Sequence, residues 1–171
     1  PAREGMAGRQ RPMSDIAVVP FGRDLAGDFR RLNLDWIERL FAVEEPDRKV
    51  LDDPEGAIVA KGGMIFFALD GEAVVGTAAM LRISDARYEL AKMAVASTHQ
   101  RRGIGELLGR ACKDWAKGKG VQTVFLETNS RLANAIRLYE RLGFRHAVDP
   151  HPSDYARADV YMELPIEQKR G

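Results

Sequence analysis

The chain has 171 residues, 26 Lys and Arg against 25 Asp and Glu, a formal net charge of +1 and 45% hydrophobic residues. This length suits one well-packed domain and leaves no room for a second of ordinary size. The near balance of charge argues against nucleic acid and anionic membranes as partners. A single cysteine, Cys112, excludes an internal disulfide and, placed among apolar helix positions, reads as a small buried hydrophobe. Without an apolar run long enough to span a membrane, the sequence predicts a cytoplasmic protein.

The N-terminal third predicts a leader, a strand and two helices. Residues 1–12 are rich in arginine, glycine and proline, so we expect a disordered leader or a cloning remnant, then one domain over 13–167 and a tail at 168–171. A first strand is predicted at 16–20, followed by a helix that Asp24 caps and that runs to about Phe41. Glu45-Pro46-Asp47 predicts a second short helix, because proline is favoured in the first helical turn, and 53–56 reads as a turn.

The remaining two thirds predict strands that alternate with helices. Apolar runs at 64–69 and 73–81 around Asp70-Gly71 indicate a β-hairpin. Strands are expected at 87–96, 121–127 and 158–164, and helices at 106–117 and 132–142, the last one ended by Gly143. This order predicts an α/β fold built on a sheet of mixed strand direction.

A basic, glycine-containing turn follows the strand at 87–96. Its sequence is Gln100-Arg101-Arg102-Gly103-Ile104-Gly105, directly before the predicted helix. Glycines at a helix start let the backbone approach a ligand, and the unpaired N–H groups of the first turn favour an anion. The alternative is a plain strand-to-helix connection with surface arginines. The arginines beside the helix start favour phosphate binding.

Two motifs resemble those of the GNAT superfamily of N-acetyltransferases. Gln100-Arg101-Arg102-Gly103-Ile104-Gly105 is similar to its pyrophosphate-binding pattern Q/R-x-x-G-x-G/A, and 135–144 is similar to its second signature, which contains Tyr139 and ends in Gly143-Phe144. The resemblance covers about 66–164. It implies a central, twisted, mostly antiparallel sheet of six or seven strands flanked by helices, with acetyl-CoA as cosubstrate.

The resemblance also implies a set of cofactor contacts. The pyrophosphate would bind the backbone of Arg101, Arg102, Gly103, Ile104, Gly105 and Glu106, and the pantetheine arm would lie along Met93, Ala94 and Val95. The thioester would then point into a gap between this strand and the strand that contains Glu127. Met93 and Val95 are equally compatible with ordinary core packing. Many relatives have an asparagine where this chain has Leu132, so no amide side chain is assigned to the cofactor.

Three residues are candidates for the catalytic chemistry. By resemblance Tyr139 lies where the thiolate leaves and would touch the cofactor and donate a proton; the alternative is a helix tyrosine bonded locally. Glu89 and Glu127 match positions at which different branches of the family carry a functional glutamate, and either could take a proton from an ammonium. Glu89 lies four residues before Met93, so the strand period places both on one face, and we rank it first. The alternative for each is a solvated or arginine-paired carboxylate.

The favoured function is transfer of an acetyl group from acetyl-CoA to a primary amine of a small molecule, peptide or protein, by direct attack in a ternary complex. A non-catalytic acyl-CoA sensor is the alternative; it would need the glycine turn but neither Glu89 nor Tyr139. No metal is expected, because the three histidines lack ligand spacing. Acceptor-side candidates are Trp36, Glu44, Glu45, Asp47 and Tyr155. An edge strand at 160–164 would allow a homodimer.

Overall fold

The computed structural model describes residues 15–168. The predicted leader and residues 169–171 of the predicted tail lie outside this range. The helices are α1 (Ala26–Leu40), α2 (Glu45–Asp52), α3 (Ile104–Gly118) and α4 (Ala133–Leu142). The strands are β1 (Ile16–Pro20), β2 (Met64–Asp70), β3 (Ala73–Arg82), β4 (Arg87–Val95), β5 (Thr123–Thr128), β6 (Arg145–His146) and β7 (Val160–Pro165). Within these residues no helix combines the length and the apolar character needed to cross a membrane.

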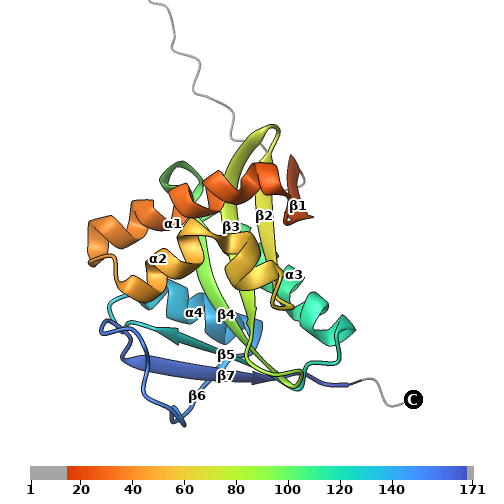
Figure 1. The fold of residues 1–171 in the computed structure, drawn as a ribbon, viewed down its shortest axis with the longest axis vertical. Helices are drawn as coiled ribbons and strands as arrows, with labels where there is room; N and C mark the ends of the chain where they lie inside the picture. The colour runs from red at the N-terminus through yellow and green to blue at the C-terminus, as the bar shows by residue number, and fades with distance from the viewer. Residues whose placement is uncertain (1–14, 169–171) are drawn as a thin grey trace, which may run out of the picture.

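The strands form one seven-stranded sheet in the order β1-β2-β3-β4-β5-β7-β6. Every neighbouring pair is antiparallel except β4 and β5, which are parallel. The predicted mixed, mostly antiparallel sheet is therefore confirmed. The parallel pairing covers only Arg87–Glu89 against Thr123–Phe125, and beyond it the two strands point in different directions (Figure 1). The sheet thus opens at the C-terminal ends of β4 and β5.

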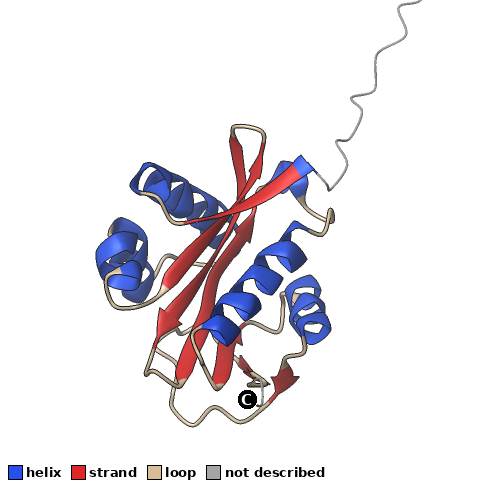
Figure 2. Cartoon of the chain, turned by 90° about the vertical axis from the view of Figure 1, so that its right-hand side faces the viewer, coloured by secondary structure: helices blue, strands red, loops and turns tan. Residues whose placement is uncertain are grey.

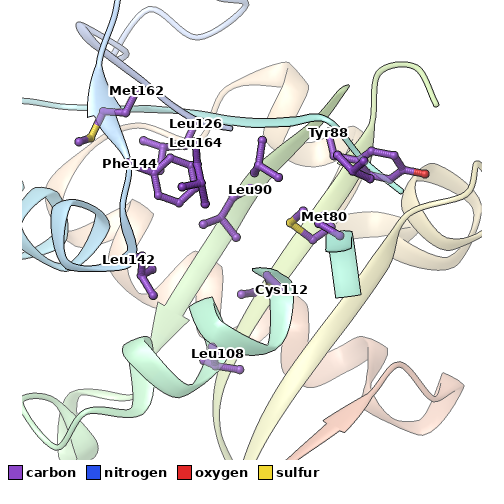
Figure 3. Close-up of a cluster of buried hydrophobic side chains, with 14 of the residues drawn as sticks. Met80, Tyr88, Leu90, Leu108, Cys112, Leu126, Leu142, Phe144, Met162 and Leu164 are labelled. Carbon is purple, nitrogen blue, oxygen red and sulfur yellow. The ribbon is translucent and has the colours of Figure 1, made fainter. Parts of the chain in front are cut away.

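Helices cover both faces of the sheet (Figure 2), and each face has its own hydrophobic core. On one face α1 and α2 pack against alternate residues of β2 and β3; this core consists of Phe29, Ile37, Leu51, Ile58, Ile65, Phe67 and Ala79. On the other face the buried side chains come from α3, α4 and the intervening strand positions, among them Leu90, Leu108, Cys112, Leu142 and Phe144 (Figure 3). The two cores follow from the two-residue period of a strand, which sends successive side chains to opposite faces.

Cys112 lies inside the second core, as its place among apolar helix positions predicts. Its side chain is 2% exposed, and burial raises the pKa of the thiol to about 12. The thiol therefore packs as a small hydrophobic group and is not ionised near neutral pH.

Three local predictions need correction. Asp24 does not cap α1, because it belongs to a 3-10 turn, Arg23–Leu25, that precedes the helix. The N-cap of α1 is Leu25, and no side chain caps it. The turn expected at 53–56 continues into a π-helical turn, Glu55–Val59. The last strand is not an edge strand along its whole length, because β6 pairs with it through Glu163 and Met162.

Candidate functional site

A cavity of about 860 Å³ opens where β4 and β5 separate. It is lined by the C-terminal parts of these two strands, the first turns of α3 and α4, the end of α1 and the loop before β7. The predicted site residues on its wall are Glu89, Met93, Ala94, Val95, Arg101, Gly103, Ile104, Gly105, Glu106, Glu127 and Tyr139. Of the predicted set, Arg102 alone is not on the cavity wall.

The cavity passes through the sheet, so its lining residues divide between two faces. Met93 and Tyr139 pack against the core under α3 and α4, and Gly105 of α3 lies on the same side as the Met93 sulfur. Glu127 faces the opposite side, because its neighbour Leu126 belongs to the α3 and α4 core. The gap can thus be approached from either face of the sheet.

Glu89 lies on the same face as Glu127, opposite to Met93, and this corrects the expected common face of Glu89 and Met93. Its partner on β3 is Leu81, which packs with the α1 and α2 core. A bulge follows at Lys92, where the four residues from Ala91 to Ala94 of β4 lie opposite the three residues from Thr77 to Ala79 of β3. The extra residue has a positive φ of 54°, and it reverses the alternation of side chains. The prediction of a common face was wrong because the two-residue period holds only for a strand without a bulge.

The basic turn leads into α3 as predicted, although the helix begins at Ile104, two residues earlier than the expected Glu106. Gly103 is the N-cap with a φ of 78°, a left-handed conformation that glycine adopts without strain. Gly105 has a packing reason as well, because a Cβ there would lie 2.9 Å from Leu138 Cδ2. Glu106 forms an ion pair with Arg110, with Nη2 and Oε1 2.9 Å apart. Gly103, Ile104, Gly105 and Glu106, which form the N-cap and the start of α3, line the cavity at the end predicted to hold phosphate.

Tyr139 lies on α4 with its ring edge-on to Phe144, at 6.2 Å between centroids. Burial raises the pKa of its phenol to about 12, so the hydroxyl keeps its proton at neutral pH. Among residues 15–168 no side chain or backbone group is hydrogen-bonded to this hydroxyl. The local hydrogen bond expected of a purely structural helix tyrosine is therefore not formed. A protonated hydroxyl on the cavity wall can donate a proton to a bound group.

The pKa values of both carboxylates on the opposite face are raised. Burial, followed by the charge of Glu127, raises the pKa of Glu89 to about 7, against the opposing effect of Lys92. Burial also raises the pKa of Glu127, although a hydrogen bond from Ser153 to its Oε2, 2.6 Å long, favours the ionised form. A carboxylate with a pKa near the working pH is suited to accept and release protons.

The acceptor-side candidates separate into two groups. Trp36 and Tyr155 line the cavity as expected. Glu44 and Asp47 are paired with Arg157, and Glu45 is paired with Arg48. The acids of α2 and its N-cap are therefore bound by the protein's own cations and are not free to attract a cationic acceptor.

The lining residues that were not predicted include Lys92 and Arg157. Lys92 is 9% exposed and Asp47, which it contacts, is fully buried. One signal for Lys92 was present in the sequence, because a charged residue between Ala91 and Met93 interrupts an otherwise apolar strand end. Arg157 carried no such signal, since it lies in a polar loop among other charged residues. Within the described range no set of three or more His, Cys, Asp or Glu side chains could hold a metal ion.

Comparison with known proteins finds matches in sequence and in fold. The model of the "Acetyltransferase (GNAT) family" matches residues 30–144. The [Ribosomal protein bS18]-alanine N-acetyltransferase of Escherichia coli is 31% identical over 135 residues, which are 77% of this chain and 81% of that protein. N-acetyltransferase 8B of Rattus norvegicus is 32% identical over 98 residues, 54% of this chain but only 44% of the length of that relative.

Solved structures share the fold at lower sequence identity. A GNAT-family acetyltransferase from Staphylococcus aureus superposes with a TM-score of 0.81 at 18% identity, covering 89% of this chain and 99% of the other. An acetyltransferase from Salmonella typhimurium, solved with its cofactor acetyl-CoA, gives a TM-score of 0.71 at 19% identity, covering 91% and 96%.

Proposed function

Because this chain belongs to the GNAT family of acetyltransferases, we propose that it transfers the acetyl group of acetyl-CoA to a primary amine in a ternary complex. The observation that carries this proposal is the cavity through the sheet. It has a phosphate-suited helix start and Tyr139 on one side, and two carboxylates of raised pKa on the other. The acceptor is an amine of a small molecule, a peptide or a protein.

The cofactor enters this proposal from the α3 and α4 face. Its pyrophosphate binds the backbone N–H groups between Arg101 and Glu106, where the helix dipole favours negative charge. Its pantetheine arm follows Met93, Ala94 and Val95, next to the opening left by β5. The acetyl-CoA-bound structure of similar fold supports this assignment, as does the position of the glycine turn at one end of the cavity.

The acceptor amine approaches from the opposite face, where Glu89 and Glu127 lie. A carboxylate removes one proton from the ammonium, directly or through water, and the neutral nitrogen attacks the thioester carbonyl. The C–S bond breaks as the C–N bond forms, and Tyr139 gives its proton to the leaving thiolate. The new amide nitrogen loses its remaining extra proton to water, and water returns a proton to Tyr139, so that each turnover yields the amide, the CoA thiol and one proton released to solvent. We place Glu89 first as the base because its pKa lies at about 7, and Glu127 second.

An acyl-CoA sensor without catalysis would need the cofactor face alone. The buried, proton-accepting Glu89 and the hydroxyl of Tyr139, which is not bonded by the described residues, favour the enzyme, because a sensor has no use for either group.

Binding and turnover test the proposal in two steps. Calorimetric titration with acetyl-CoA, with dephosphorylated pantetheine as the control, should show binding that requires the pyrophosphate. A panel of amines is then incubated with acetyl-CoA and examined by mass spectrometry. It includes a peptide that begins with alanine, because the E. coli relative is named as an alanine N-acetyltransferase of ribosomal protein bS18. Acetylation that disappears in a Glu89→Gln/Glu127→Gln double variant supports the enzyme. Tight binding without transfer to any amine would favour the sensor, and absence of binding would overturn both.

A further inference from the structure

A buried ion cluster lies beside the cavity on the acceptor face. Asp47 of α2 accepts two hydrogen bonds from Arg157, 2.8 Å from Nη1 to Oδ2 and 2.6 Å from Nη2 to Oδ1, and a third from the Nζ of Lys92. Although burial raises the pKa of Asp47, the hydrogen bonds from Arg157 and Lys92 lower it to about 2. Asp47 is therefore ionised, and the cluster joins α2, the β4 bulge and the loop before β7.

Hydrogen bonds continue from this cluster to a candidate base. Lys92 Nζ also donates to the Tyr155 hydroxyl at 3.1 Å, and the backbone N–H of Tyr155 donates to Ser153 Oγ at 3.1 Å. Ser153 Oγ in turn donates to Glu127 Oε2 at 2.6 Å. Two sets of hydrogen bonds, joined through the covalent body of Tyr155, thus connect a fully buried carboxylate on α2 to a carboxylate on the cavity wall.

The cluster is a costly way to stabilise a fold. Removing charges from water carries a large penalty, and hydrophobic residues of similar volume often serve as well or better. The bulge itself places Lys92 at a φ of 54°, which is uncommon for a residue with a side chain. In this conformation the Lys92 side chain donates a hydrogen bond to Asp47. In an unbroken strand the alternation of side chains would place it on the face of the α3 and α4 core. Such features concentrate at functional sites.

We infer that Lys92 is a positioning residue for acetyl transfer, and that with Asp47 it holds Tyr155, Ser153 and Glu127 in the arrangement that receives the acceptor amine. Lys92 does not touch the reacting atoms in this inference; it acts through Tyr155 and the loop before β7. The inference rests on the proposed function, because it needs an acceptor and a transfer step.

Single-group substitutions along the path test the inference. Lys92→Met keeps the stem of the side chain and removes the ammonium, whereas Tyr155→Phe and Ser153→Ala each remove one hydroxyl. The matched control is Arg48→Met, which breaks the exposed pair with Glu45 on the same helix. Steady-state constants for the amine, the acetyl-CoA dissociation constant and the melting temperature are measured for all variants and for the Lys92→Met/Ser153→Ala pair.

The path predicts a specific pattern in these constants. Each of the three variants should lower kcat/KM for the amine by a factor on the order of 10, because small displacements of reacting groups strongly reduce the rate. The acetyl-CoA dissociation constant should stay at the wild-type value. The double variant should lose no more than the worse single variant, because both changes break the same path. Arg48→Met should match the wild type throughout.

Two results would overturn the inference while the wild type is active. One is a folded Lys92→Met variant with wild-type kcat/KM; the other is a double variant whose loss is the product of the two single losses. If Lys92→Met does not fold, the same criteria apply to Tyr155→Phe and Ser153→Ala, which leave the ions in place. A wild-type protein that acetylates no amine would instead contradict the proposed function itself.

Discussion

Replacing Glu89 with glutamine keeps the size of the side chain and removes its ability to take a proton. If Glu89 is the base, wild-type kcat should follow its ionisation, because only the carboxylate form accepts a proton from the ammonium. With a pKa of about 7, the ionised fraction is about one-tenth at about pH 6 and about nine-tenths at about pH 8. Wild-type kcat should therefore rise about tenfold over this interval. The Glu89→Gln variant should lose the rise, and its kcat should be lower than that of the wild type by a factor of about 10² to 10⁴.

The assay is release of the CoA thiol at saturating acetyl-CoA and amine, so that kcat reports groups in the ternary complex. Glu127→Gln is the informative partner variant. Because the charge of Glu127 raises the pKa of Glu89, its removal should move the rise in kcat to lower pH without abolishing it. A shift of the profile would show that Glu127 acts as a neighbouring charge, whereas loss of the rise would identify it as the base.

The stability of the same variants gives a readout that does not depend on turnover. Folding raises the pKa of Glu89 from 4.5 to about 7, so the folded state holds the proton more tightly, and the stability of the wild type falls as pH rises through this interval. Glu89→Gln should consequently melt above the wild type at pH 8 and close to it at pH 4. A Glu89→Gln variant with the wild-type rate and pH profile, beside a Glu127→Gln variant that loses both, would refute the assignment and make Glu127 the base.

Four further substitutions test other parts of the molecule. Gly105→Val places atoms against Leu138, because even a Cβ would lie 2.9 Å from Leu138 Cδ2; calorimetry should show weaker acetyl-CoA binding, and unchanged affinity in a folded variant would contradict the phosphate site. Tyr139→Phe should lower kcat on the order of 100-fold at unchanged acetyl-CoA affinity, and a full rate would remove its role as the acid. Asp47→Asn leaves buried cations without their counter-charge and should cost about 3–5 kcal/mol in a urea titration; the stability that Asp47 gives the wild type is present above the ordinary aspartate pKa of 3.8 and is lost as pH falls through about 2. Leu132→Asn supplies a side-chain cap to α4, whose N-cap Leu132 has none, and should raise stability by about 1 kcal/mol, measured as a higher melting temperature.

The sequence predicted most of the sheet and its helices because their signals are local. Alternating apolar residues around Asp70-Gly71 specify β2 and β3 as observed, and Gly143 ends α4 in the left-handed conformation expected of it. The glycine turn and Tyr139 were found for the same reason, because each belongs to a short motif. They line one cavity in the structure.

The features that were missed depend on contacts between distant segments. Asp47 and Arg157 are 110 residues apart, so their pairing has no local signature. Asp47 was therefore named from the sequence as an acceptor-side candidate without its partner. Counting alternate strand positions could not reveal the bulge at Lys92. This bulge is the reason that Glu89 and Met93 lie on opposite faces of the sheet. β6 spans only two residues, too few for any periodic pattern, yet it covers part of β7.

The buried Cys112 makes this protein convenient to study with thiol-reactive dyes. Because its thiol is 2% exposed and its pKa is raised to about 12, a dye added to follow released CoA should not be consumed by the folded enzyme. The same side chain becomes reactive when α3 leaves the sheet. The rate of its labelling in the absence of substrates would then report how often the core opens under native conditions.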